Sequence, residues 1–241
     1  MRLVRSCGKI ARMNWGRLIA AVMVVVVGPS LGTADTFVRI TQPEGKDGSG
    51  TGCSSGTLIG WTTDCSRGIF ISCAHGYDKE RPVEVEVEPG QIAEGRFLAI
   101  DRDLELSLIA ASISRSTAML RLADRSPRRC EAVRLIGYPG RKFASTETRI
   151  AGEYWSRDAC TSRWTLYHAE PCCACPEGYH ELLVTGAASV AGLSGGAVVR
   201  NMRLAGVVIG RIANARDAGL VVPGATVQQF LRKNIAQFYR R

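Results

Sequence analysis

Residues 190–199 read VAGLSGGAVV and place one serine, Ser194, between glycines inside an otherwise apolar run. A serine hydroxyl attacks a carbonyl only when a base removes its proton, and the resulting oxyanion needs preorganised hydrogen-bond donors. Glycines allow backbone N–H groups to turn toward such an oxyanion. We therefore predict that the amides of Gly192 and Ser194 form an oxyanion hole. The alternative is a plain tight turn between two strands.

A base for Ser194 is expected among the three histidines of the chain, His75, His168 and His180. Only His75, in GIFISCAHGY (68–77), directly follows an apolar strand-like run with a small residue before it. A single histidine at a strand end is more often structural than catalytic. Combined with the Gly-Leu-Ser-Gly-Gly sequence, however, His75 predicts a serine–histidine pair.

Short strand-like runs separated by Gly, Pro and Asp fill most of the chain, among them GTLIGW (56–61), VEVEVE (83–88) and LAGVVIGRI (204–212). Strands spaced this closely, without long helical patterns, indicate an all-β sandwich or barrel. A polar stretch divides them into about six on each side. We predict two six-stranded antiparallel β-barrels, 35–122 and 130–241, joined by a linker at 123–129. The second ends in an amphipathic C-terminal helix.

The run AIDRDLELSLIAAS (99–112) completes a wider pattern. With it, the sequence resembles the trypsin-like serine proteases of the chymotrypsin fold, and more closely their compact bacterial, Deg-like branch without a PDZ domain. In that family a glycine-rich strand, SSGTLIG (54–60) here, leads to a strand that ends in Ala-His. An acidic residue follows, and a Gly-x-Ser-Gly-Gly elbow comes last. The resemblance covers roughly residues 36–231.

The resemblance implies a carboxylate that orients His75, and two acids are candidates. Read from Glu105, the run Glu-Leu-Ser-Leu-Ile fits the family's order of acid, apolar, small, apolar, apolar, with Glu in place of Asp. Read from Asp103, a charge stands where a small residue belongs. We expect both side chains on one strand face, about 6.6 Å apart at ~3.3 Å per residue, so only one reaches His75. We favour Glu105 and keep Asp103 as the alternative.

The resemblance also implies the reaction, which is hydrolysis of peptide bonds through an acyl-enzyme on Ser194. It places Ala188 at the base of the primary substrate pocket and a stretch containing Val207, Val208 and Gly210 along its wall. Because no acid lies there, we expect a preference for small or aliphatic side chains over Lys or Arg. The expected partner is a protein or peptide, and no cofactor is expected. The alternative is a catalytically silent chymotrypsin-like binding protein.

The first 34 residues have the pattern of a secretory signal, in which basic residues precede an apolar run (18–27) and small residues end at Ala34. The apolar run is about half the ~20 residues that cross a bilayer, so we predict cleavage near Ala34 over a retained anchor. The product would be secreted or periplasmic, with no membrane span. Five of the 31 basic residues precede Ala34, which leaves 26 against 22 acids, a net charge of +4. Without a basic tract interleaved with aromatics, nucleic-acid binding is not expected.

Eight of the nine cysteines lie beyond the signal: Cys53, Cys65, Cys73, Cys130, Cys160, Cys172, Cys173 and Cys175. An even number in an exported chain predicts disulfides, whose pairing the sequence leaves open. The first three of them are candidates for local pairs. The cluster at 160–175, with His168 and His180, also has zinc-ligand chemistry. Adjacent cysteines splay apart and an oxidising compartment favours disulfides, so we predict a stapled loop and no metal, with a zinc-stabilised module as the alternative.

Overall fold

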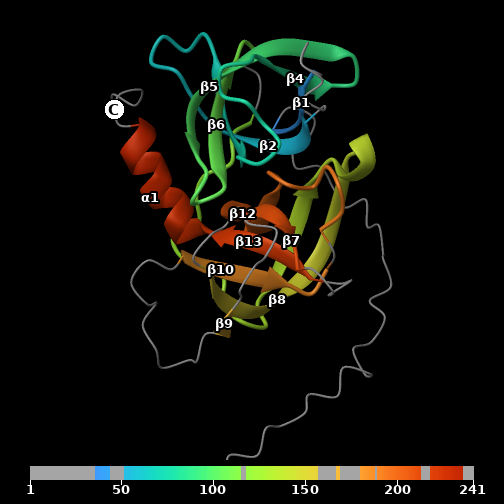
Figure 1. Cartoon of the computed structure of the whole chain (residues 1–241), viewed down its shortest axis with the longest axis vertical. Coiled ribbons are helices and arrows are strands. Elements are labelled where there is room, and N and C mark those ends of the chain that lie inside the picture. The colour runs from blue at the N-terminus through green and yellow to red at the C-terminus, as the bar shows by residue number, and fades with distance from the viewer. Residues whose placement is uncertain are drawn as a thin grey trace, which may run out of the picture.

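The structure is a computed structural model that describes residues 36–43, 52–114, 118–156, 167–168, 180–187, 189–212 and 218–235. Figure 1 shows two strand-rich lobes stacked along the long axis of the molecule, with helix α1 (Gly224–Ile235) beside them. The predicted signal segment, 1–34, lies outside the described residues. Within the described part of the chain, no helix has the length and apolar character needed to cross a membrane.

The first lobe is a closed antiparallel barrel of six strands in the order β1-β2-β3-β6-β5-β4. The pairing of β1 with β4 closes it, and hydrogen-bonded closure leaves no free sheet edge. The strands are β1 (Phe37–Gln42), β2 (Gly52–Trp61), β3 (Gly68–Cys73), β4 (Val83–Glu88), β5 (Gln91–Asp101) and β6 (Leu106–Ala111).

Strand β4 illustrates how the sequence pattern builds this barrel. Its valines alternate with glutamates, so the two residue types point to opposite faces of the sheet. Val83 and Val85 are at most 1% exposed and belong to the main core, whereas Glu84 faces solvent. Glu86 pairs across the sheet with Arg39 of β1. The alternation therefore marks an inside and an outside, as expected for a barrel strand.

The second lobe is also a six-stranded antiparallel barrel, in the order β10-β13-β12-β11-β7-β8, and a β8–β10 pairing closes it. A two-residue strand, β9 (Tyr167–His168), adds to β8. The barrel strands are β7 (Ala132–Gly137), β8 (Ala144–Ser156), β10 (His180–Thr185), β11 (Ala197–Arg200), β12 (Arg203–Arg211) and β13 (Gly219–Pro223). The predicted all-β architecture of two six-stranded barrels is confirmed.

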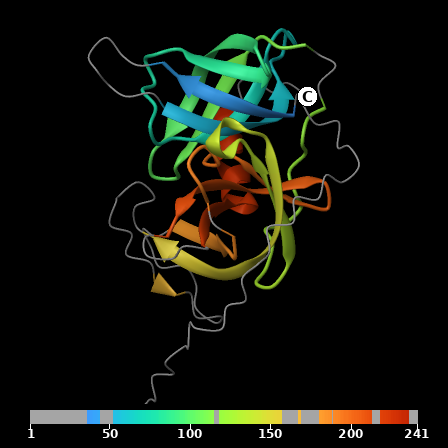
Figure 2. The ribbon, with the colours of Figure 1, turned by 90° about the vertical axis from the view of Figure 1, so that its right-hand side faces the viewer.

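Helix α1 (Gly224–Ile235) follows β13 directly and completes the fold. Its buried side chains Val227, Phe230 and Ile235 repeat every three to five residues and join the main core, so the predicted C-terminal helix is confirmed. That core contains residues of both barrels. Figure 2 shows the two lobes stacked closely on one another. The two lobes are thus one packed body, which allows a site to be shared between them.

The connection between the barrels is anchored to both. Leu120 donates its amide to Leu58 of the first barrel, and Leu122 forms a bridge with Leu204 of the second. The chain therefore changes lobe between residues 120 and 122. The domain limits given above remain a prediction.

Candidate active site

The Gly-Leu-Ser-Gly-Gly segment forms a tight elbow directly before β11. Gly192 and Gly195 have φ of 90° and 80°, a region that side chains rarely adopt. A Cβ on Gly192 would lie 2.6 Å from the Tyr138 oxygen, and one on Gly195 would lie 2.1 Å from the Ser55 oxygen. Neither position accepts another residue without a rearrangement. The glycines of the motif are therefore required by the backbone path on both sides of Ser194.

The amides of the elbow divide into two groups. Those of Leu193, Gly195 and Gly196 donate to backbone carbonyls of the protein at distances of 2.6–3.0 Å. Those of Gly192 and Ser194 donate to no residue that the structure describes. The two amides predicted to bind an oxyanion are thus the two that the elbow does not use for its own structure.

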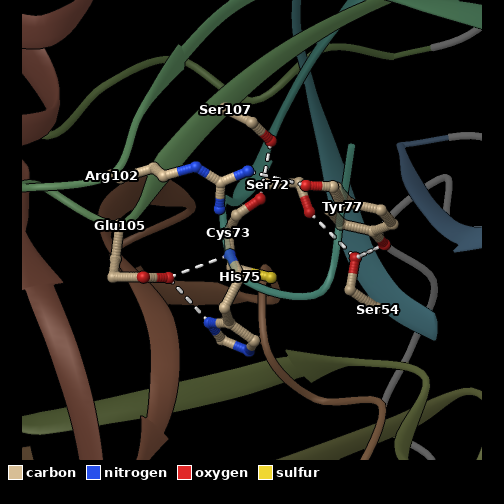
Figure 3. Close-up of polar contacts among 8 residues, drawn as sticks. All are labelled: Ser54, Ser72, Cys73, His75, Tyr77, Arg102, Glu105 and Ser107. Carbon is tan, nitrogen blue, oxygen red and sulfur yellow. Dashed lines mark hydrogen bonds and ion pairs between the residues drawn. The ribbon is translucent and has the colours of Figure 1, made fainter. Parts of the chain in front are cut away.

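His75 lies in the loop that follows β3, and Glu105 holds it by two bonds. The Nδ1 atom of the ring is 2.7 Å from Glu105 Oε2, and the backbone amide of His75 donates to the same oxygen at 3.0 Å (Figure 3). The Ala74 amide donates to the Glu105 carbonyl at 3.1 Å. When the ring is neutral, a carboxylate at Nδ1 keeps the proton there and leaves Nε2 as the base. Ring orientation and tautomer are both set by Glu105.

Glu105 is 1% exposed and lies in the turn between β5 and β6, with φ of 56°. Two contacts hold this turn: the Leu104 amide donates to Asp101 Oδ1 at 3.0 Å, and Arg102 donates to the Tyr77 carbonyl at 2.9 Å. The expectation that Asp103 and Glu105 share a strand face is wrong, because both lie in the turn, where the period of two does not apply. Asp103 is exposed to solvent. The structure brings Glu105, and not Asp103, to His75.

The surroundings of His75 change its pKa. Burial lowers the pKa of His75, but interactions with the Cys73 side chain and the Glu105 carboxylate outweigh it and raise this pKa from 6.5 to about 10. The second oxygen of Glu105, Oε1, is buried and has no hydrogen-bond partner among the described residues. The negative charge of Glu105 is therefore directed at His75, and it favours the imidazolium that forms when His75 accepts a proton.

The elbow packs against the strand that leads to His75. The Gly195 position is so close to the end of β3 that a Cβ there would lie 2.3 Å from Ser72 Oγ and 3.0 Å from the Cys73 amide. Ser194 directly precedes Gly195, and His75 follows Cys73 by two residues. The two residues therefore come from the two sides of this contact. Ser194 Oγ has no hydrogen bond to a described residue, so no Ser194–His75 bond is formed here. In free enzymes such bonds are often long and tighten when substrate binds.

The expected pocket residues lie in different environments. Ala188 is outside the described residues. Val207 and Val208 are fully buried, one in each of the two core clusters. Gly210 borders open space, since a Cβ there would have no atom within 4 Å. Of the three residues expected in the wall, only Gly210 is partly exposed.

Cys53, Cys65, Cys73 and Cys130 are free thiols, so the local pairs expected among the first three are not formed in this structure. The four cysteines of the cluster at 160–175 lie outside the described residues, as does the zinc site that the alternative would build on them. Across the described ranges, no group of three or more His, Cys, Asp or Glu side chains is arranged to hold a metal ion.

Comparison with known proteins supports the architecture. No protein-family model and no curated relative matches the sequence. Among solved structures, the active form of the Rv3671c protease from M. tuberculosis is similar, with a TM-score of 0.66 and 19% identity over 84% of this chain and 82% of that one. An inactive Ser343Ala mutant of Rv3671c has a TM-score of 0.65 and 18% identity over 87% and 91%.

The serine endoprotease from Yersinia pestis is also similar, with a TM-score of 0.61 and 18% identity over 84% of this chain and 63% of that one. At this level of identity the likeness concerns the fold. The chain has the two-barrel chymotrypsin-like fold.

Proposed function

We propose that this chain is a serine endopeptidase in which Ser194 is the nucleophile, His75 the general base and Glu105 the residue that orients His75. The observation that carries the proposal is the His75–Glu105 contact of 2.7 Å, on a loop whose strand packs against the Ser194 elbow. The chymotrypsin-like fold and the protease neighbours support it. Histidines whose pKa is shifted by a buried carboxylate are enriched at catalytic sites, and acyl transfer is a reaction that uses such a pair.

The reaction follows from the arrangement. His75 Nε2 takes the proton of Ser194 as the Ser194 oxygen bonds to the carbonyl carbon of the substrate. The carbonyl oxygen becomes negative and accepts hydrogen bonds from the Gly192 and Ser194 amides. His75 then gives its proton to the leaving amine as the peptide bond breaks. His75 then takes a proton from water as the water oxygen attacks the acyl carbon, and it gives that proton to Ser194 Oγ as the ester bond breaks.

The proposal extends to substrate and location. Gly210 borders open space and the expected pocket residues carry no charge, so we expect cleavage after small or aliphatic side chains. The N-terminal pattern favours export, with the mature chain starting near Asp35, and the motif order favours the Deg-like branch. Mass spectrometry of the N-terminus of the exported protein tests the first of these, and a peptide library tests the preference.

Labelling with a fluorophosphonate tests the reaction itself. The wild-type protein should become covalently modified at Ser194, and Ser194→Ala should not. Asp103→Asn serves as a matched control that should label like wild type. If wild type folds but stays unlabelled, the chain is a silent chymotrypsin-like binding protein instead.

A further inference from the structure

Ser55, on β2 of the first barrel, is completely buried and uses every polar atom, and two of its hydrogen bonds reach the elbow of the second barrel. Its amide donates to the Ser194 carbonyl at 2.7 Å, and its hydroxyl donates to the Gly192 carbonyl at 2.7 Å. The hydroxyl also accepts the Tyr138 amide at 2.8 Å. Its own carbonyl accepts Ser72 Oγ at 2.7 Å. One residue therefore holds two carbonyls of the segment that contains the nucleophile.

The direction of the two hydroxyl bonds is determined by their partners. The Tyr138 amide can only donate and the Gly192 carbonyl can only accept, so the Ser55 hydrogen must point at Gly192. The chain also leaves space for this hydroxyl, since a Cβ on Gly137 would lie 2.5 Å from Ser55 Oγ. A buried hydroxyl with both roles filled is a fixed group, because losing either partner leaves a polar atom unsatisfied.

The bond to Gly192 matters because this glycine is free to rotate. With no Cβ, Gly192 can exchange its φ of 90° for other values at low cost, and its peptide groups would turn with it. Its carbonyl is held by Ser55, and the Ala191 carbonyl before it accepts the Gly140 amide at 2.9 Å. In a trans peptide the N–H points opposite to the C=O, so the Gly192 amide is directed away from Gly140.

We infer that Ser55 is a positioning residue that preorganises the oxyanion hole from the opposite barrel. It fixes the carbonyls of Gly192 and Ser194, whose peptide groups directly adjoin those that carry the Gly192 and Ser194 amides, and so keeps both amides directed at a developing oxyanion. Such donors accelerate acyl transfer because they need no reorganisation during the reaction. The inference rests on the proposed function, and its test separates the two.

The test compares Ser55→Ala with wild type on a fluorogenic peptide that has alanine before the scissile bond, and on a fluorophosphonate. Complete loss of an oxyanion donor lowers kcat by about 10²- to 10³-fold. A donor that remains but is less well oriented should cost less, so we expect kcat to fall by roughly 10- to 100-fold. KM should change less than about threefold, because an interaction made only in the transition state lowers kcat alone. Fluorophosphonate labelling of Ser194 should slow in parallel but still occur.

Ser54→Ala is the matched control. Ser54 is the preceding buried serine on β2, and its hydroxyl bonds to Tyr77 and Ser72 instead of the elbow. Loss of a buried hydrogen bond should lower its stability as in Ser55→Ala, while kcat stays within threefold of wild type. The pH profile of Ser55→Ala should keep the wild-type shape, because the histidine–carboxylate pair is untouched.

Gly137→Ala is a second route to the same effect, since its methyl group would displace the Ser55 hydroxyl without changing residue 55. If Ser55→Ala does not fold, the kcat of Gly137→Ala tests the role of Ser55 instead. The inference is overturned if kcat of the folded variant stays within threefold of wild type, if only KM changes, or if Ser54→Ala loses as much activity. If wild type neither cleaves nor labels, the proposed function fails instead.

Discussion

The two barrels share one architecture but contribute different things to the candidate site. The first barrel contributes side-chain chemistry, in the form of a histidine and a carboxylate 2.7 Å apart. The second contributes backbone geometry, in the form of an elbow in which Gly192 and Gly195 have positive φ and the amides of Gly192 and Ser194 donate to no described residue. A change at the histidine or the carboxylate of the first barrel should therefore alter protonation, whereas a change at the glycines of the elbow should alter the shape of the site.

The largest expected effect is that of Ser194→Ala, which removes the proposed nucleophile. We expect kcat to fall on the order of 10⁶-fold, as for other serine nucleophiles. Stability should change little, because Ser194 Oγ bonds to no described residue. Peptide cleavage with thermal unfolding as control measures both. Residual cleavage above about 10⁻³ of wild type would assign the nucleophile elsewhere.

The next effect separates the two acids of the first barrel. Glu105→Gln keeps the shape but removes the charge, and its amide can favour the wrong tautomer of His75, so kcat should fall about 10⁴-fold. Asp103→Asn changes an exposed residue and should leave kcat within about twofold. Steady-state kinetics on both variants provides the comparison. The opposite pattern would mean that the acid bonded to His75 in this structure is not the one that acts.

Within the second barrel, Gly195→Ala should be destabilising through backbone geometry alone. Its φ of 80° and a Cβ 2.1 Å from the Ser55 oxygen together should cost about 2–4 kcal/mol. Gly210→Ala is the matched control, since its Cβ would meet no atom within 4 Å, and it should change the free energy of unfolding by less than about 0.5 kcal/mol. Urea unfolding measures both. Equal stability of the two variants would show that the elbow is not constrained.

The smallest expected effect is on pH dependence and belongs to the first barrel. His75 acts as a base only when neutral, and its pKa is raised to about 10, so kcat/KM should rise with pH well above 6.5. Cys73→Ala removes one interaction that raises this pKa and should move the rise toward lower pH. A rise centred at or below pH 6.5 in wild type would contradict the predicted environment of His75.

The same pKa links protonation to folding. The pKa of His75 is higher in the folded protein than the 6.5 of an unperturbed histidine. Protonation therefore stabilises the fold fully below pH 6.5, and this contribution is lost as pH rises toward 10. Thermal unfolding across this range should show it in wild type and not in His75→Ala.

Local motifs predicted those features of the backbone that depend on immediate neighbours. The Ala-His at the end of β3 and the glycines around Ser194 are of this kind, because a strand end and a positive φ are properties of a few consecutive residues. The preference for Glu105 came from the order of residue types. Strand periodicity wrongly placed Glu105 and Asp103 on one strand face. Glu105 instead lies in a turn with φ of 56°, which no alternation pattern reveals.

Contacts between the barrels could not be predicted in this way. Ser55 and Gly192 are 137 positions apart, and SSGTLIG suggested only a glycine-rich strand. The lining of the substrate pocket could not be predicted either. Val207 and Val208, which were expected in its wall, are core residues, and only Gly210 borders open space. Which side of a buried strand faces a substrate depends on how the barrel closes, and the residues of one strand do not contain that information.

The proposed reaction requires a histidine of the first barrel to act on a serine of the second. A crystal structure of the protein with a peptide boronate bound tests this directly. We predict boron bonded to Ser194 Oγ, a boronate oxygen on the Gly192 and Ser194 amides, and His75 Nε2 within hydrogen-bond distance of the adduct. An unmodified Ser194 with saturating boronate present, or a His75 ring that points away from it, would contradict the account.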